Sequence, residues 1–479
     1  MLKETLFIYS PRYLKVLVYM LQNAEYRPSA YLKWFWRTDH FSRVMYRRQL
    51  ELTRAAKLLL GSLYIGSVIE VTAGIVLFYL GIHNHFAGGW AFGLALLLAY
   101  PIVWAHLVVL PLWAGRLLVS LPAERELIAQ SEQIFRRHKG IKIAVAGSYG
   151  KTTMKEILLS VLSQGFDVAA TPANMNVPIS HARWAKKLTN QEQILIIEYG
   201  EGKPGDIRRF CQVTHPTHAV ITGLAPAHLD KYKTLHSAGE DIFSLLEYIP
   251  ADKVFISNES EAIKPFLQDK LEQFNRHGAL GWSVTNVKFD ITGTKFKLVK
   301  GKARLGFHSG LIGRQHVGYL AFAAALGMNL GLTPEQVQVG IEATRPFEHR
   351  MQPYPLNGAW IIDDTYNGNL EGVKAGTELL HELPAQRKLY VTPGLVDQGQ
   401  EIVSVHQAIG RLIAAAQPDL TVLMDNSVTK YIRSGLKDGG YKGELKVETD
   451  PLRFYTNLKH FVAAGDVVLM QNDWPDNYF

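Results

Sequence analysis

The segment that most constrains the fold joins an apolar run to a helical pattern through a glycine turn, and it reads AVAGSYGKTTMKE from Ala144 to Glu156. The run Ile141–Ala146 has the length and β-branching of a buried strand, and residues Met154 to Ser163 carry helical spacing. Phosphate groups need inward-pointing backbone N–H groups and the positive end of a helix. The segment therefore predicts a strand, a phosphate-binding turn and a helix that begins at the lysine.

Each polar residue of this turn has an expected task. Gly147 and Gly150 let the backbone turn closely, Lys151 reaches the outer phosphates, and the Thr152 hydroxyl takes one coordination site on Mg²⁺. Val145 stands where the general GxxxxGK[ST] pattern has its first glycine. A glycine-rich turn that binds nothing therefore stays as the alternative.

Positive charge is concentrated at the start of the chain. Residues 1–57 contain eleven Lys or Arg and four acids, so +7 of the net charge of +8 lies there. Tyr and Trp residues alternate with these cations, which is typical of a helix at a membrane interface, and we expect no nucleic-acid partner. The one cysteine, Cys211, excludes an internal disulfide framework.

Two apolar stretches follow, Leu58–Ile82 with one formal charge and Trp90–Ala114 with none. Each is long enough to cross a bilayer, and a pair of buried core helices is the alternative. Cations flank the pair and the short turn between them has none, so both ends of the hairpin should lie in the cytoplasm. We therefore predict a multi-pass protein of the inner (cytoplasmic) membrane, with both termini and the catalytic domains in the cytoplasm.

The one acid in these stretches, Glu70, is expensive to expose at the centre of a bilayer. It should be protonated, paired or covered by other protein. His106 lies at a similar distance from the expected tip and is the nearest candidate partner.

From Gly140 onwards, strand-like and helical runs alternate, which is the pattern of a mostly parallel α/β sheet. Candidate strands are 141–146, 193–198, 218–222 and 253–257. Glu198 ends the second of these strands and His228 follows the third. Ligands of open α/β sheets gather at that edge, although imidazole is an unusual ligand for a hard cation. The residues alone therefore leave the role of His228 open.

Six ordered motifs resemble those of the Mur ligases. They are GSYGKTT at 147–153, TPANMN at 171–176, EYGEGKPG at 198–205, APAHLD at 225–230, SN at 257–258 and DDTYNGN at 363–369. The resemblance implies an α/β chain with a central P-loop domain of parallel sheet and a C-terminal Rossmann-like domain, here behind an N-terminal helical membrane hairpin. The expected boundaries are 1–57 for the basic interfacial segment, 58–135 for the hairpin and linker, 136–345 for the ATP-binding domain, and 346–479 for the Rossmann-like domain.

The resemblance also implies a reaction, ATP-driven amide formation through an acyl phosphate with Mg²⁺ as cofactor. The motifs are most similar to those of members that add a D-alanyl-D-alanine-type dipeptide to a muramyl-peptide precursor in cell-wall synthesis. Because a hairpin replaces the usual UDP-sugar-binding domain, a lipid-linked precursor presented at the cytoplasmic membrane is a second possible acceptor. The same motifs are also compatible with a polyglutamate-type or amidating ligase that joins another amino acid, and with a nucleotide-binding envelope scaffold without catalysis.

The same resemblance assigns site residues. Those implied for the nucleotide are Gly147, Ser148, Gly150, Lys151, Thr152, Thr153, Asn258, His316, Arg350 and Asp364; for the metal, Thr152, Glu198 and His228; and for catalysis, Lys151, Glu198, His228 and Arg350. Tyr366, Asn367 and Asn369 would shape the same cleft.

Three departures from the family pattern stand out. His316 replaces a usual asparagine, and the last strand lacks a following basic residue. Gly239 stands where the family commonly has a carbamylated lysine, so Glu240 or Asp241 is a candidate to supply the carboxylate instead.

Overall fold

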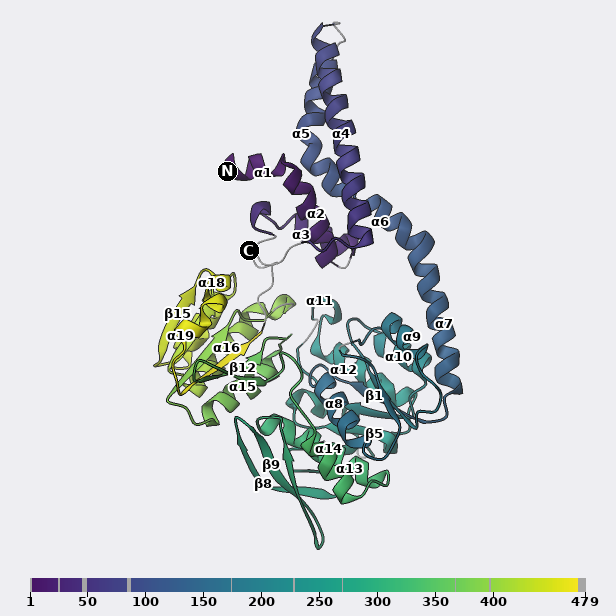
Figure 1. Ribbon diagram of the computed structural model, residues 1–479, viewed down its shortest axis with the longest axis vertical. Helices are drawn as coiled ribbons and strands as arrows, with labels where there is room; N and C mark the ends of the chain where they lie inside the picture. The colour runs from purple at the N-terminus through teal and green to yellow at the C-terminus, as the bar shows by residue number, and fades with distance from the viewer. Residues whose placement is uncertain are drawn as a thin grey trace. The chain divides into compact units, whose positions relative to one another are not determined.

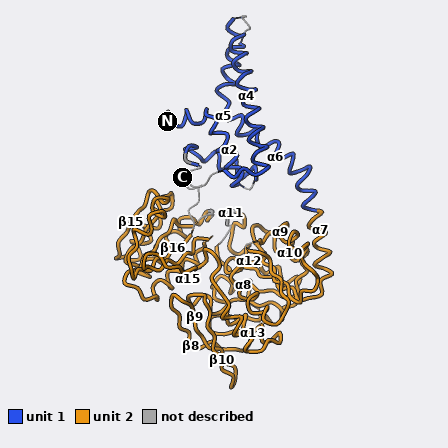
Figure 2. The backbone as a smooth tube through the Cα atoms, viewed as in Figure 1, with its two compact units in different colours: residues 1–125, 475–479 blue, residues 126–474 orange. Residues whose placement is uncertain are grey.

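The computed structural model describes residues 2–24, 26–44, 50–83, 88–173, 175–226, 229–268, 270–366, 368–395 and 398–472 (Figure 1). The chain divides into two compact units, residues 1–125 with 475–479, and residues 126–474 (Figure 2).

The first unit is helical. Its helices are α1 (Leu2–Ile8), α2 (Pro11–Asn23), α3 (Pro28–Phe35), the 3-10 helix η1 (Phe41–Arg43), α4 (Arg54–His83), α5 (Gly89–Leu107) and α6 (Val109–Gly115). Helices α4 and α5 form an antiparallel pair (Figure 1). Glycines allow their close approach, since a Cβ on Gly93 would lie 2.6 Å from the carbonyl oxygen of Gly74. A π-helical turn (Arg116–Ser120) continues into α7 (Leu121–Arg137).

The hairpin of α4 and α5 has an apolar surface. Helix α4 and the continuous helical stretch Gly89–Arg137 are long and apolar enough to cross a membrane, by length and composition alone. The carboxylate of Glu70 is buried and has no hydrogen-bond partner within the described part of the chain. His106 instead places Nδ1 2.8 Å from the carbonyl oxygen of Ile102 and packs against Phe35 and Trp36. The predicted pairing of Glu70 with His106 is therefore wrong.

The second unit begins with a ten-stranded sheet in the order β10-β9-β8-β7-β6-β5-β4-β1-β3-β2. Its parallel strands are β1 (Ile141–Ala146), β2 (Val168–Ala170), β3 (Ile194–Glu198), β4 (His218–Ile221), β5 (Val254–Ser257) and β6 (Glu272–Asn275). An antiparallel extension adds β7 (Gly278–Ala279), β8 (Trp282–Asp290), β9 (Gly293–Lys300) and β10 (Ala303–Ser309). The four predicted strands are thus confirmed as β1, β3, β4 and β5, with small shifts at their ends.

Helices cover both faces of this sheet. One face packs against α8 (Lys151–Leu162), α13 (Val317–Asn329) and α14 (Pro334–Glu342). The opposite face packs against α9 (Pro178–Ala185), α10 (Asp206–Thr214), α12 (Leu235–Phe243) and the end of α7. The short α11 (Leu229–Tyr232) precedes α12. Strand β1 lies between β3 and β4, so the segment after β1 lies beside the ends of both neighbours.

A six-stranded sheet in the order β11-β12-β16-β13-β14-β15 forms the C-terminal part of this unit. Its strands are β11 (Gln352–Leu356), β12 (Ala359–Asp364), β13 (Arg387–Thr392), β14 (Leu420–Met424), β15 (Glu444–Glu448) and β16 (Asp466–Gln471), and only β11 is antiparallel to its neighbour. Its helices are α15 (Leu370–Glu382), α16 (Ile402–Ala416), α17 (Thr429–Asp438), α18 (Pro451–Thr456) and α19 (Leu458–Phe461). They leave a buried core on each face of the sheet. This doubly wound arrangement confirms the predicted Rossmann-like fold class.

Candidate active site

The turn between β1 and α8 has a backbone that only glycine adopts easily. Gly147 has φ of 133° and Gly150 has φ of 73°. A Cβ on Gly147 would lie 2.4 Å from Oγ1 of Thr222, and a Cβ on Gly150 would lie 2.3 Å from the hydroxyl of Tyr319. Side chains at either position would therefore collide with the residues that support the turn.

The residues after β4 hold this turn in shape. The backbone N–H of Ser148 donates to the carbonyl of Gly223 at 2.9 Å, and the Thr222 hydroxyl lies 3.1 Å from the Ala146 carbonyl and also contacts the Tyr149 carbonyl. Tyr319 from α13 in turn donates its hydroxyl to the Thr222 carbonyl at 3.0 Å. The turn is preformed, so a ligand does not have to order it.

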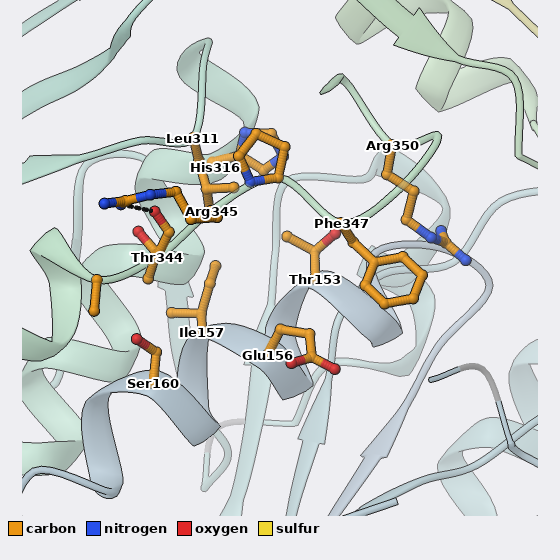
Figure 3. Close-up of a pocket in the computed structure, with 12 residues that line it drawn as sticks. Thr153, Glu156, Ile157, Ser160, Leu311, His316, Thr344, Arg345, Phe347 and Arg350 are labelled. Atoms are coloured by element: carbon orange, nitrogen blue, oxygen red, sulfur yellow. Dashed lines mark hydrogen bonds between the residues drawn. The ribbon is translucent and has the colours of Figure 1, made fainter. Parts of the chain in front are cut away.

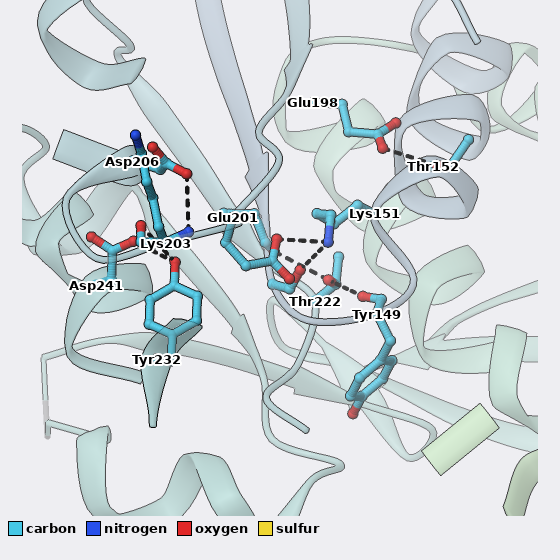
Figure 4. A network of polar contacts seen from close by, with 12 residues as sticks. Tyr149, Lys151, Thr152, Glu198, Glu201, Lys203, Asp206, Thr222, Tyr232 and Asp241 are labelled. Atoms are coloured by element: carbon cyan, nitrogen blue, oxygen red, sulfur yellow. Dashed lines mark hydrogen bonds and ion pairs between the residues drawn. The ribbon is translucent and has the colours of Figure 1, made fainter. Parts of the chain in front are cut away.

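Lys151, the first residue of α8, is held by an acid. Its Nζ lies 2.8 Å from Oε2 of Glu201 and also donates to the carbonyl of Gly147 (Figure 4). The Glu201 side chain is only 3% exposed. Sequence reasoning missed Glu201, although it stands three residues after Glu198 in the same glycine-rich motif.

Thr152, the next residue, contacts a second acid. Its hydroxyl donates to Oε1 of Glu198 at 3.0 Å (Figure 4). Oε2 of Glu198 is buried, lies 3.4 Å from Nζ of Lys155, and has no hydrogen-bond partner in the part of the chain that the structure describes. This oxygen therefore has the Lys155 ammonium as a counter-charge and keeps acceptor capacity that no hydrogen bond from the described residues uses. Glu198 with Thr152 therefore fits a magnesium ion, which takes hydroxyl and carboxylate oxygens.

Three neighbours fix the position of Glu198. Its backbone N–H donates to Oγ1 of Thr171 at 3.0 Å, and its carbonyl accepts from Nε2 of His181 at 2.9 Å. Burial lowers the pKa of His181 to about 4, so this imidazole is neutral near pH 7. The ammonium of Lys155 is fully buried and donates to the carbonyls of Thr171, at 2.9 Å, and Ala173. Lys155 and His181 are further residues that the sequence did not single out.

The predicted metal ligand His228 lies outside the described residues, as does Asn367. Among the described residues, no three His, Cys, Asp or Glu side chains form a group that could hold a metal ion. Magnesium commonly uses one or two protein carboxylates and completes its shell with phosphate oxygens and water. A nucleotide would supply those oxygens at Glu198.

Glu240 and Asp241, the two acids considered as replacements for the lysine that Gly239 replaces, lie in different environments. Glu240 is exposed and lies 3.5 Å from His236 on the same helix. Asp241 is buried and accepts hydrogen bonds from the Tyr232 hydroxyl and the Gly205 N–H, both at 2.8 Å. Both oxygens of Asp241 are therefore used to anchor the loop that carries Glu201, and Glu240 pairs with His236 at the surface. A Cβ on Gly239 would lie 2.3 Å from the Phe266 ring.

We predict that Asp241→Asn lowers the free energy of unfolding by about 1–3 kcal/mol, because one of its buried hydrogen bonds loses its acceptor. Glu240→Gln, the matched control on the exposed side of the same helix, should change it by less than about 0.5 kcal/mol. Denaturant unfolding followed by circular dichroism measures both. Equal effects of the two variants would contradict the role given to Asp241.

A cavity of about 290 Å³ lies beside α8 (Figure 3). It is lined by Thr153, Glu156, Ile157 and Ser160 of α8, by Leu311 and His316, and by residues 343–347 and Arg350. His316 has Nδ1 2.9 Å from the Ile312 carbonyl, so Nδ1 carries the proton, and burial lowers the pKa of His316 to about 4. The neutral ring therefore leaves Nε2 as an acceptor, which suits an exocyclic amine such as that of adenine.

Arg350 is half-buried at the edge of this cavity. Burial lowers the pKa of its guanidinium, which the nearby charges of Glu198 and Asp364 partly offset, and Tyr366 lies beneath it at 4.4 Å. Its Nε is buried without a hydrogen-bond partner among the described residues. The fold thus brings the charges of Arg350 and Glu198, about 150 residues apart in the sequence, near enough to influence each other. A buried guanidinium nitrogen without a hydrogen-bond partner among the described residues fits an anion such as phosphate.

Two further predicted nucleotide residues already have partners. Asp364 is half-buried and accepts from Gln471 at 2.7 Å and from the Met351 N–H at 3.1 Å; desolvation raises the pKa of Asp364 to about 7. The Asn258 side chain bonds Gln273 and Asn275, both at 2.8 Å. Asn369 caps α15 by accepting from the Gly372 N–H at 2.9 Å.

The raised pKa of Asp364 predicts a pH-dependent stability. The folded chain binds this proton more tightly than the unfolded chain, whose aspartate has a pKa of about 3.9. The resulting stabilisation is complete below about pH 4 and is lost as the pH rises through about 7. Asp364→Asn should remove this part of the decline in the free energy of unfolding between pH 5 and pH 8. Asp438→Asn, at the exposed end of α17, should leave the decline unchanged. The measurement is the free energy of unfolding in urea as a function of pH. Parallel curves for Asp364→Asn and the unsubstituted chain would contradict the raised pKa of Asp364.

Comparison with known proteins agrees with this geometry. Residues 145–327 match the Mur ligase middle domain. The UDP-N-acetylmuramoyl-tripeptide–D-alanyl-D-alanine ligase of Escherichia coli (strain K12) is 27% identical over 333 residues, which cover 68% of this chain and 72% of that protein. The chain contains a Mur ligase middle domain. The predicted resemblance is confirmed.

Solved structures show the Mur ligase fold over a wider range. MurF of Acinetobacter baumannii has a TM-score of 0.63 at 19% identity and covers 73% of this chain and 77% of its own. The MurF ligase of Thermotoga maritima, solved in complex with ADP, has a TM-score of 0.64 at 21% identity. The match covers 73% of this chain and 80% of that structure's chain.

The localisation predicted from the sequence is wrong. The relatives are named UDP-N-acetylmuramoyl-tripeptide–D-alanyl-D-alanine ligases, and two apolar helices are weak evidence for a membrane protein, so the expected multi-pass protein of the inner membrane is not supported. The prediction rested on the length and hydropathy of two helices and on the cations that flank them. A core helix of a soluble protein can meet the same test of length and hydropathy.

Proposed function

We propose that this Mur ligase chain is an ATP-dependent ligase that joins a D-alanyl-D-alanine-type dipeptide to a muramyl-tripeptide precursor of the cell wall. The reaction and its substrates are those named for the E. coli relative. One observation carries the proposal for this chain: the preformed glycine turn lies beside a buried Glu198 oxygen and near a buried Arg350 nitrogen, both without hydrogen-bond partners among the described residues. These groups are complementary to a metal-bound polyphosphate.

The nucleotide would lie between the turn and the cavity. The backbone N–H groups at the start of α8 and Lys151 would bind the β- and γ-phosphates, since a helix N-terminus favours anions. Thr153, His316 and the 343–347 segment line the cavity that would receive the adenine. Asp364 would reach the ribose, as the family motif implies.

The proposed reaction has two steps, formation of an acyl phosphate and formation of the amide. An oxygen of the substrate carboxylate attacks the γ-phosphorus, the bond from that phosphorus to the bridging oxygen breaks, and ADP leaves an acyl phosphate. The amine of the dipeptide then attacks the acyl carbon, the C–O bond to phosphate breaks, and the amine loses a proton to solvent. Arg350 and Lys151 stabilise the negative charge on the transferred phosphoryl oxygens.

Glu198 and Thr152 would hold the magnesium ion, whose chemistry is to neutralise charge on the phosphate oxygens. Lys155 and His181 hold Glu198 in place for that task. His228 is proposed as a further ligand from its motif alone.

A phosphate-release assay tests the proposal. The full chain is mixed with ATP and Mg²⁺, with soluble or lipid-linked muramyl tripeptides, and with D-alanyl-D-alanine or single amino acids. Phosphate release that requires both an acceptor and the dipeptide is expected. Release only with glutamate or ammonia would favour a polyglutamate-type or amidating ligase. Nucleotide binding without turnover on any acceptor would contradict catalysis and favour a nucleotide-binding scaffold.

Arg350→Gln should lower kcat by at least about a hundredfold while the chain stays folded, because the half-buried guanidinium would stabilise charge that develops in the transition state. The matched control is Arg208→Gln, which removes an exposed arginine paired with Glu247. It should keep kcat within about a factor of two, as surface substitutions usually do. Similar turnover for both variants would remove Arg350 from the mechanism.

A further inference from the structure

Glu201 has an unusual environment for a carboxylate. It is almost completely buried, its Oε2 lies 2.8 Å from Nζ of Lys151, and Lys151 is the residue expected to bind phosphate. The adjacent residue Thr152 bonds Glu198. Two acids therefore contact two successive residues at the start of one helix, where negative charge from a nucleotide would also gather (Figure 4).

This ion pair conflicts with phosphate binding. When phosphates take the Lys151 ammonium, Glu201 loses its cation in a site with little water, and a buried carboxylate without a partner is strongly unfavourable. Repulsion between Glu201 and the phosphates would add to that cost. The conflict is removed if a divalent cation takes the carboxylate as the phosphates take the lysine.

The loop cannot easily carry Glu201 away from the turn. Glu198, three residues earlier, is fixed at the end of β3 by Thr171 and His181. Gly205, four residues later, donates its N–H to the buried Asp241, which also holds the Tyr232 hydroxyl. The carboxylate of Glu201 is thus held beside the phosphate-binding turn from both sides.

Glu198 provides a second acidic oxygen beside the turn with unused acceptor capacity, and the Lys155 ammonium lies 3.4 Å from it. Oε2 of Glu198 lacks a hydrogen-bond partner in the described structure, and Glu198 is 1% exposed. Magnesium sites that include a nucleotide commonly use one or two protein carboxylates. With Asp241 committed to the loop and Glu240 exposed, Glu201 is the buried carboxylate in contact with the turn besides Glu198, among the residues described.

We propose that Glu201 is a second carboxylate ligand for divalent metal, paired with Lys151 in the free protein and transferred to the cation when the nucleotide binds. This inference rests on the proposed function, because it requires a nucleotide at the turn. Its consequence is that nucleotide and cation depend on each other for binding more strongly than in a site without Glu201.

The test measures binding and needs no turnover. The full chain is titrated with adenylyl-imidodiphosphate, either with Mg²⁺ or with EDTA, by isothermal titration calorimetry. Mg²⁺ should tighten binding to the unsubstituted chain by at least about tenfold, which reflects coupling of the usual size. In Glu201→Gln, the analogue should bind more tightly in EDTA than it binds to the unsubstituted chain. The factor by which Mg²⁺ tightens binding of the analogue should fall at least about fivefold.

The control variant is Glu261→Gln, which neutralises an exposed acid paired with Lys264, and it should keep the full gain from Mg²⁺. A second readout is the binding of Mn²⁺ to the nucleotide-bound chain, followed by electron paramagnetic resonance. The affinity for Mn²⁺ should fall in Glu201→Gln. Thermal unfolding checks that each variant is folded, and if Glu201→Gln is not, Glu201→Asp is used and should retain part of the gain.

The possible results distinguish failure of the proposed function from failure of the role given to Glu201. If the unsubstituted chain binds no nucleotide under any condition, the proposed function fails. If it binds with the expected gain from Mg²⁺, but Glu201→Gln shows the same gain and the same Mn²⁺ affinity, the function stands. Glu201 then only orients Lys151, and its role as a metal ligand is overturned.

Discussion

The structure of the second unit depends on the close contact between the glycine turn after β1 and the residues after β4. Gly147 and Gly150 have positive φ and approach Thr222 and Tyr319 too closely for any side chain. This contact brings the start of α8 to the carboxyl ends of β3 and β4, where Oε2 of Glu198 faces the Lys155 ammonium and accepts no hydrogen bond from the described residues. Every proposed step of the chemistry needs that alignment, since phosphoryl transfer is catalysed mainly by position and charge.

Charge at the site is arranged in opposing pairs. Lys151 contacts Glu201, Lys155 contacts Glu198, and Arg350 is close to Glu198 and Asp364. Such buried pairs contribute little net stability, because desolvation offsets most of their attraction. Their value is positional, since each holds a charged group at the turn until a ligand of the right charge replaces its partner.

The sequence predicted much of this because short-range patterns decide it. Strand β1, the glycine turn and α8 follow from β-branching, glycine spacing and helical period, and the order of the six motifs led to the fold class. The edge strand β2 was missed because it has only three residues. Helix hydropathy and flanking cations led to the wrong localisation, because neither identifies what covers an apolar helix.

Long-range contacts could not be predicted in the same way. Nothing in the local sequence shows that Glu201 meets Lys151, that Asp241 anchors Gly205, or that Lys155 is buried against Glu198. The most direct test of the account is a crystal structure with Mn²⁺ and a non-hydrolysable ATP analogue, with the metal located by anomalous scattering. The account predicts a manganese peak at Glu198 Oε2 and the Thr152 hydroxyl, with the phosphates at the glycine turn. A nucleotide bound elsewhere, or a metal away from Glu198, would contradict it.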